Sequence, residues 1–269
     1  MAADKDASSP IDTTVSQPAR VYNYWLGGKD NFAADRAYGD AVARAFPTVR
    51  TAAIENRRFL HRAIDFLVRD AGIRQFVDIG TGLPLSPNTH EIAQSIAPES
   101  RVVYVDNDKL VLVHARALMV GTPVGKTAYI DADVRNLDAI LGAPELRNTL
   151  DLTQPVALVL GALMHFIPDE DDPHGVVGRL VDALAPGSYL ALTQSTTDYW
   201  PDVFVQEIRD GKHGVFYPRS RSEFARFFDG LDLVEPGVSP VTTWHPNEEQ
   251  APYAREEEVC MYGAIGVKR

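Results

Sequence analysis

The sequence contains one cysteine, Cys260, and no long hydrophobic run. A single cysteine excludes an intramolecular disulfide and a cysteine-based zinc site, so we expect Cys260 to lie unreactive in a strand. No apolar stretch approaches the roughly 20 residues that a membrane-spanning helix needs. The N-terminal residues show neither the apolar core of a secretory signal nor the Arg-rich pattern of a transit peptide. We therefore expect a cytoplasmic protein with no membrane partner.

Positive charge is scarce as well. The chain has 26 lysines and arginines against 37 aspartates and glutamates, which gives a net charge of -11. Nucleic-acid binding depends on clustered Lys and Arg side chains that neutralise phosphates, and the sequence shows no such cluster. It also lacks an aromatic-flanked polar motif such as N-P-P-Y after the fourth predicted strand. We expect no nucleic-acid partner, and a small-molecule substrate is favoured.

The composition is otherwise that of a globular protein, with 269 residues of which 45% are hydrophobic and 23% charged. Residues 1–17 are rich in Ala, Asp, Ser, Thr and Pro without a hydrophobic period, which predicts a disordered tail. Residues 18–72 are predicted to form an N-terminal helical segment, because apolar residues recur at helical spacing over 51–71 and Gly72 supplies a stop. Residues 73–269 are predicted to form the main domain.

From residue 73 onward, strand-like and helical patterns alternate. Short apolar, β-branched runs occur at Gln75–Ile79, Val102–Val105, Ala128–Ile130, Val156–Leu160 and Tyr189–Thr193. Helical patterns separate them, for example at Lys109–Val120 and Val176–Ala185. This order predicts an α/β fold with a Rossmann-like, doubly wound, mostly parallel sheet and helices on both faces. The last strand-like runs, Leu231–Val234 and Val259–Val267, lack a clear crossover helix between them, which predicts an antiparallel edge.

The first predicted strand ends in the sequence DIGTG, a turn typical of nucleotide binding. Gly80 and Gly82 allow a close backbone approach and dihedral angles that other side chains disfavour. A dinucleotide fingerprint would need a third glycine where this chain has Leu85. Pro84 and Pro87 also postpone the next helix, so its N-terminus would not meet a pyrophosphate directly. The turn suits a ligand without a pyrophosphate and disfavours an NAD-dependent oxidoreductase, which stays open as an alternative.

Acidic residues follow the second and third predicted strands. Asp106 stands 24 positions beyond Gly82, where a carboxylate can accept hydrogen bonds from both hydroxyls of a ribose. Asp133, in DADVR, can accept from an adenine amino group while the amide of Val134 donates to the ring. Each feature alone could be a turn or a helix cap. Together, in order on successive strand ends, they favour the adenosine of S-adenosylmethionine.

Several further motifs complete the pattern. The stretches RVYNYWLGGKDNF, DIGTGLP with NTHE, VVYVDND, DADVR, HFIPDEDDP and LAPGSYL resemble a family of class I S-adenosylmethionine-dependent methyltransferases typical of actinobacteria, long known as a domain of unknown function. The resemblance runs from about Arg20 to Arg269. It implies a seven-stranded sheet with an antiparallel last strand and S-adenosylmethionine as cofactor, and it says little about the acceptor. Pro84 departs from the general methyltransferase pattern, which often has glycine there, so the local approach to the methionine moiety could differ.

The resemblance also assigns residues to the cofactor. The implied contacts are Gly80, Thr81 and Gly82 for the methionine part, Asp106 and Asn107 for the ribose and adenine side, Asp133 and Val134 for the adenine, and Gly161 and Ala162 near the sulfonium. Arg57 and the segment around Tyr24 are candidates for the methionine carboxylate, although Arg57 could equally lie on a solvated helix face. The rings of Tyr22, Tyr24 and Trp25 would either form a lid hinged at Gly27 and Gly28 or attach the N-terminal segment to the domain.

Methyl transfer needs no catalytic triad, because the sulfonium is already a good leaving group and alignment is the main requirement. A general base is needed only for a protonated acceptor, and His165, directly after the fourth predicted strand, is the preferred candidate. The alternative is a histidine that hydrogen-bonds the backbone or packs over the adenosine.

We expect no metal, because the acidic loop PDEDDPH can complement a helix dipole without an ion. The sequence thus predicts a small-molecule methyltransferase, with a non-catalytic S-adenosylmethionine sensor as the main alternative. Nucleic-acid methylation is a weaker one.

Overall fold

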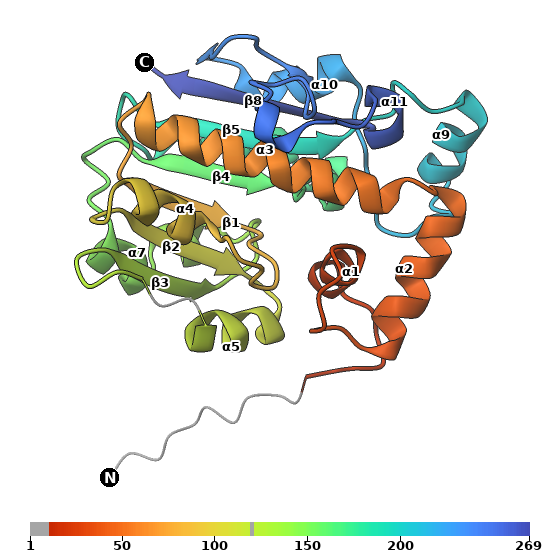
Figure 1. The fold of residues 1–269 in the computed structure, drawn as a ribbon, viewed down its shortest axis with the longest axis horizontal. Coiled ribbons are helices and arrows are strands. Elements are labelled where there is room, and N and C mark those ends of the chain that lie inside the picture. The colour runs from red at the N-terminus through yellow and green to blue at the C-terminus, as the bar shows by residue number, and fades with distance from the viewer. Residues whose placement is uncertain (1–10, 119–120) are drawn as a thin grey trace.

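The computed structural model describes residues 11–118 and 121–269. Its strands form one sheet in the order β3-β2-β1-β4-β5-β8-β6, with a short strand β7 also paired to β8 (Figure 1). The strands are β1 Gln75–Ile79, β2 Arg101–Asp106, β3 Lys126–Asp131, β4 Ala157–Gly161, β5 Tyr189–Ser195, β6 Leu231–Leu233, β7 Ser239–Pro240 and β8 Met261–Lys268. Strands β1 to β5 are parallel, and β8 runs antiparallel to β5, β6 and β7.

This arrangement confirms the predicted α/β fold with a mostly parallel sheet and an antiparallel end. The sheet has eight described strands where seven were expected. The additional strand β7 is two residues long and ends in a proline, so it carries no alternating pattern that sequence reasoning could detect. None of the described helices is long and apolar enough to cross a membrane.

Helices cover both faces of the sheet. The described α-helices are α1 Pro18–Trp25, α2 Ala33–Ala45, α3 Val49–Arg69, α4 Thr89–Ile96, α5 Lys109–Leu118, α6 Leu137–Leu141, α7 Pro144–Thr149, α8 Pro173–Asp182, α9 Asp202–Arg209, α10 Arg221–Ala225 and α11 Glu256–Val259. Helix α3 crosses one face in front of β4 and β5 (Figure 1), where Phe59 and Leu67 pack against strand residues such as Phe76. On the opposite face, Val177 and Phe224 pack against Leu158. Both faces of the strands are therefore buried, which explains their continuous apolar runs.

Local sequence signals account for several helix boundaries. The helix expected over 51–71 is α3, and the delayed helix after the first turn is α4. Helix α4 begins with a capping box in which the side chain of Glu91 accepts a hydrogen bond from the Asn88 amide at 2.6 Å. The last strand was predicted to start at Val259, but Val259 ends α11 and Cys260 takes a left-handed conformation before β8. Glu258 causes this difference, because its carboxylate accepts from the Arg255 amide at 3.0 Å and closes a helical turn.

Helices α1 and α2 lie beyond the carboxyl ends of the parallel strands, on the side toward which the arrows of β1 to β5 point (Figure 1). Part of the predicted tail, residues 1–10, lies outside the described residues. Within residues 11–17, the amide of Gln17 donates to Asp35 at 2.9 Å, and Ile11 packs against Leu83, Leu110 and Val111. The segment before α1 thus contacts the strand-end region of the domain.

Candidate functional site

The turn after β1 is shaped by two glycines with positive φ, +72° at Gly80 and +69° at Gly82. The amide of Gly80 donates to the carbonyl of Val105 at 2.8 Å, which joins the turn to the end of β2. A Cβ atom added to Gly80 would approach the Leu163 side chain to 2.8 Å, whereas one added to Gly82 would meet no atom within 4 Å. The backbone at Gly82 therefore faces open space that a ligand can use.

Asp106 ends β2 and is held from two sides. The amide of Gly82 donates to its Oδ2 and the amide of Asp108 to its Oδ1, both at 2.9 Å. Burial raises the pKa of Asp106, and these amide hydrogen bonds oppose the rise. Each carboxylate oxygen keeps a further lone pair. The structure thus places a fixed, buried acceptor between the first two strand ends.

The loop after β3 brings Asp133 close to the residue that follows β2, because the Nδ2 atom of Asn107 donates to Asp133 Oδ2 at 3.0 Å. The guanidinium of Arg135 hydrogen-bonds the same carboxylate and lowers its pKa to about 2. Arg135 also donates to Asp171 at 2.9 Å, so the acidic loop after β4 supplies an ion-pair partner. The N–H of Val134, a buried residue, has no backbone acceptor in the described part of the chain.

The end of β4 is connected to α3 through β5. Ala162 has a positive φ of 53°, an uncommon conformation for a residue with a Cβ. Its amide donates to Thr193 Oγ1 at 2.9 Å, and that hydroxyl donates to Asn56 Oδ1 at 2.6 Å. A Cβ added to Gly161 would approach the Leu60 side chain to 2.8 Å, so glycine lets α3 pack closely there. The carboxyl end of β4 is therefore fixed by buried polar contacts.

His165 follows β4 in a 3-10 turn, Met164–Phe166, and is 5% exposed. Its Nδ1 accepts from the Ser195 amide at 3.3 Å. Its ring contacts Phe166 and Phe216, with centroids 4.5 and 5.3 Å away. Burial lowers the pKa of His165 to about 3, with a smaller contribution from the positive charge of Arg219. The imidazole is therefore neutral at physiological pH.

Sequence reasoning missed Asp78, the residue on β1 just before the turn. Thr89 donates to Asp78 Oδ2 at 2.6 Å. Desolvation raises the pKa of Asp78 to about 6, even though this hydrogen bond and the positive charge of Arg57 oppose the rise. The detectable signal was a carboxylate inside an apolar parallel strand, directly before the glycine turn. A partly buried carboxylate at this position can accept a cationic group.

Arg57 and Tyr24 are engaged within the protein. The Nη2 atom of Arg57 donates to the carbonyls of Leu85 and Pro87, the latter at 2.8 Å, so this side chain holds the loop between β1 and α4. The hydroxyl of Tyr24 donates to Asp40 at 2.9 Å and accepts from Arg50 at 3.1 Å. For Tyr24, these contacts match the alternative in which the aromatic residues attach the N-terminal segment. Arg57 is half-buried and bound to a loop, which differs from the solvated helix face that was its alternative. The roles of both residues at a cofactor stay predictions.

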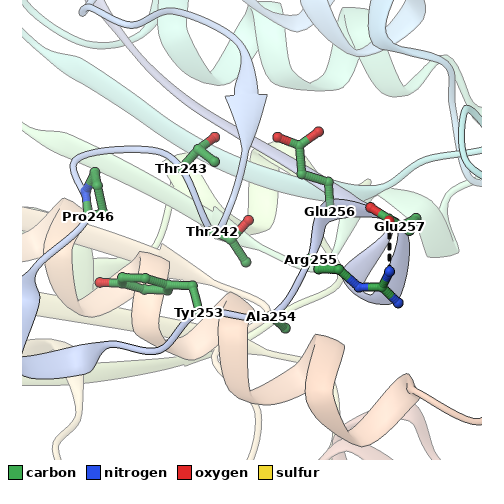
Figure 2. A pocket seen from close by; sticks show the side chains of 8 residues that line it. All are labelled: Thr242, Thr243, Pro246, Tyr253, Ala254, Arg255, Glu256 and Glu257. Carbon is green, nitrogen blue, oxygen red and sulfur yellow. Dashed lines mark ion pairs between the residues drawn. The ribbon is translucent and has the colours of Figure 1, made fainter.

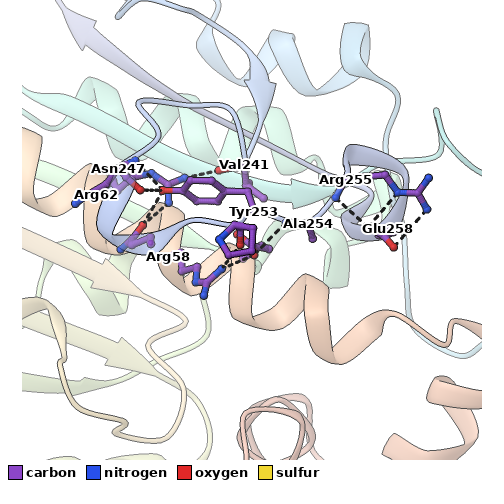
Figure 3. A network of polar contacts seen from close by, with 11 residues as sticks. Arg58, Arg62, Val241, Asn247, Tyr253, Ala254, Arg255 and Glu258 are labelled. Atoms are coloured by element: carbon purple, nitrogen blue, oxygen red, sulfur yellow. Dashed lines mark hydrogen bonds and ion pairs between the residues drawn. The ribbon is translucent and has the colours of Figure 1, made fainter.

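Two hollows lie away from the residues predicted to bind the cofactor. One, with a volume of about 480 Å³, is bounded by residues 242–246 and 253–257 near α3 (Figure 2). The other, of about 360 Å³, lies between α3, α4 and the loop around His245. The neighbouring polar network is structural: Arg62 is buried and donates to the carbonyls of Trp244 and Val241, and it stacks on Tyr253 (Figure 3). This network attaches the loop before β8 to α3.

Comparison with known proteins identifies the family. The profile of the S-adenosyl methyltransferase family matches residues 4–269. The chain belongs to this S-adenosyl methyltransferase family. A crystal structure of a DUF574 family protein from Streptomyces avermitilis shares 48% identity with a TM-score of 0.92, covering 97% of this chain and 100% of that chain. A crystal structure titled as a putative methyltransferase from Thermobifida fusca shares 41% identity with a TM-score of 0.88, covering 96% of this chain and 97% of that chain.

More distant structures share the fold. The plantazolicin methyltransferase BpumL, crystallised with S-adenosylhomocysteine, has 14% identity and a TM-score of 0.50, covering 93% of this chain and 95% of that chain. No curated protein matches the sequence. Family membership confirms the resemblance seen in the sequence motifs, and S-adenosylmethionine is the cofactor of the family. The NAD-dependent alternative has no support in these comparisons.

Proposed function

We propose that this family member transfers the methyl group of S-adenosylmethionine to a small-molecule acceptor at the carboxyl ends of β1 to β5. The observation that carries the proposal is Asp106, a buried carboxylate fixed by the amides of Gly82 and Asp108 where the first two strand ends meet. A ribose needs such an acceptor pair, and an open α/β sheet binds ligands at this edge.

The surrounding residues fit the rest of the cofactor. Burial raises the pKa of Asp78, and the methionine ammonium would stabilise the ionised carboxylate there. Gly82 faces open space that the methionine part could enter, and Thr81 lies between the two glycines of the turn. The N–H of Val134 would donate to the adenine ring, while Asp133 would accept from its amino group.

When bound, S-adenosylmethionine supplies an activated methyl group and a thioether leaving group. The protein's residues have to orient the reactants and exclude water. Gly161 and Ala162 mark the end of β4, where the sulfonium would lie. Helices α1 and α2 lie beyond the strand ends, where they would act as a cover (Figure 1).

An aromatic cluster beside His165 supports a small and largely apolar acceptor. The rings of Phe216, Trp200 and Phe204 form successive contacts, with centroids 6.1 Å apart for the first pair and 5.3 Å for the second. Phe46, between α2 and α3, contacts Trp200 at 5.7 Å. These rings are partly exposed, so their surfaces remain available to a ligand.

Calorimetric titration with S-adenosylmethionine, S-adenosylhomocysteine and NAD tests the cofactor assignment. We expect binding of the first two ligands and none of NAD. Mass-spectrometric detection of methylated product from a panel of hydroxyl and amine acceptors then tests the enzyme assignment, with Asp106→Ala as the control. Cofactor binding without product from any acceptor would favour the non-catalytic sensor over the enzyme.

His165→Gln is expected to leave cofactor affinity unchanged and to slow turnover by up to about a hundredfold, the lower limit of the usual range for general bases. We expect only this modest loss because burial lowers the pKa of His165 to about 3, which makes its imidazole a weak base. For the same reason, the pH profile should show no rise assignable to His165 between pH 5 and 8. Initial rates on an accepted substrate provide the measurement. Undiminished turnover would remove His165 as the base and leave it with its packing role.

A further inference from the structure

Helix α1 is attached to the domain by a buried ion pair. The guanidinium of Arg20 forms two hydrogen bonds with Asp108, Nε to Oδ2 at 2.9 Å and Nη2 to Oδ1 at 3.0 Å. The two residues are only 4% and 8% exposed. The remaining nitrogen, Nη1, donates to the carbonyl of Asp12 at 2.7 Å. The bidentate geometry fixes α1 in both position and orientation.

Asp108 links this ion pair to the proposed ribose carboxylate. Its amide donates to Asp106 Oδ1 at 2.9 Å, and its own Oδ1 accepts from the Leu110 amide at the start of α5. Any displacement of Asp108 would therefore move the hydrogen-bond donor that orients Asp106. Arg20 also lies over the ring of Phe32, 5.4 Å from its centroid, so the loop after α1 shares the contact.

The same helix is connected to the other half of the site. The hydroxyl of Tyr22 donates to the Ala53 carbonyl at 2.9 Å and accepts from Asn56 Nδ2 at 3.0 Å. Asn56 is the residue that receives the Thr193 hydroxyl, which in turn accepts from the Ala162 amide. One short helix is thus bonded to the turn after β2 through Arg20, and Tyr22 connects it to the end of β4 by way of Asn56 and Thr193.

We propose that Arg20 is a positioning residue for cofactor binding: through Asp108 it couples the docking of α1 to the orientation of Asp106. This inference rests on the proposed function, since it takes Asp106 as the ribose acceptor. Docked α1 covers the strand ends. Loss of the Arg20–Asp108 ion pair would therefore disorder α1 and also leave the carboxylate of Asp106 less well oriented. The cofactor then leaves faster as well as binding more weakly.

The test compares dissociation rates of S-adenosylhomocysteine by stopped-flow displacement, together with affinities by calorimetry. We expect Arg20→Ala to raise the dissociation rate and the dissociation constant by about tenfold or more, as is usual when one partner of a buried charged pair is removed. Arg20→Lys should show a smaller effect, because lysine keeps the positive charge but cannot donate the two parallel hydrogen bonds of the guanidinium. Arg44→Ala, at an exposed arginine on α2, is the matched control and should leave both quantities unchanged.

A double-mutant cycle with Asp108→Asn separates coupling from general damage. If Arg20 acts through Asp108, the double variant will bind no more weakly than the worse single variant. Additive losses, or an unchanged dissociation rate in folded Arg20→Ala, would overturn the inference. Absence of cofactor binding by the wild-type protein would instead overturn the proposed function, so the two failures are distinguishable.

Discussion

Asp78→Asn is expected to raise the melting temperature at pH 7 while removing most of the affinity for S-adenosylmethionine. The folded-state pKa of this carboxyl is raised from 3.8 to about 6, so the folded state holds its proton more tightly than the unfolded state. The ionised carboxylate therefore opposes folding, in part between pH 3.8 and 6 and fully above pH 6. At 1.36 kcal/mol per pKa unit the shift corresponds to about 3 kcal/mol. The side chain keeps some exposure, so we expect a gain of about 1–2 kcal/mol.

The same carboxylate should make cofactor binding depend on pH. A bound ammonium favours ionised Asp78, so affinity should be constant above pH 6 and fall as pH drops through 6. Calorimetry between pH 5 and 8, with thermal unfolding of the same samples, provides the measurement. Asp138→Asn, at an exposed carboxylate on α6, is the control and should change neither property. Retained affinity in Asp78→Asn, or a lower melting temperature, would contradict the assignment of Asp78 to the methionine ammonium.

Asp106→Ala is expected to weaken the binding of S-adenosylmethionine and S-adenosylhomocysteine alike by roughly 1–3 kcal/mol, the range for leaving buried polar groups without their charged partner. The variant loses the ribose acceptor and also leaves the amides of Gly82 and Asp108 without theirs. Calorimetry measures the affinities, and circular dichroism confirms that the variant is folded. Unchanged affinity in folded protein would sink the ribose assignment.

A truncated ligand distinguishes the proposed roles of Asp106 and Asp78. Methylthioadenosine keeps the ribose and adenine but lacks the amino-acid part. Asp106→Ala should therefore weaken its binding, while Asp78→Asn should leave its affinity unchanged. If both variants lost methylthioadenosine equally, the effect of Asp78 would be a general distortion of the β1 turn and not a contact with the ammonium.

Much of the fold could be predicted because its signals are local. Strands β1 to β5 are apolar, β-branched runs, and the capping residues of α4 lie three positions apart. The strand-end residues could be grouped because parallel strands bring their carboxyl ends to one edge. Gly82 and Asp106 are indeed in direct contact there. Family membership and the mostly parallel sheet agree with these predictions.

The contacts that were missed join residues far apart in the chain. Arg20 and Asp108 are separated by 88 positions, and Asn56 and Thr193 by 137. No periodicity or spacing rule connects such pairs, since their meeting depends on how α1 and α3 pack against the finished sheet. Asp78 could have been singled out from the sequence. Burying a carboxylate in an apolar strand costs free energy, so its presence there indicates a functional role.

Arg135 bridges the loops that follow β3 and β4, pairing with Asp133 on one side and Asp171 on the other. Its side chain is 50% exposed, so dissolved salt can screen both attractions. An adenine amino group would have to share or displace this guanidinium at Asp133. Moderate ionic strength should therefore ease entry of the nucleoside, against the usual trend for a positively charged ligand approaching an acidic protein. Arg135 thus occupies the carboxylate that we propose as the adenine acceptor.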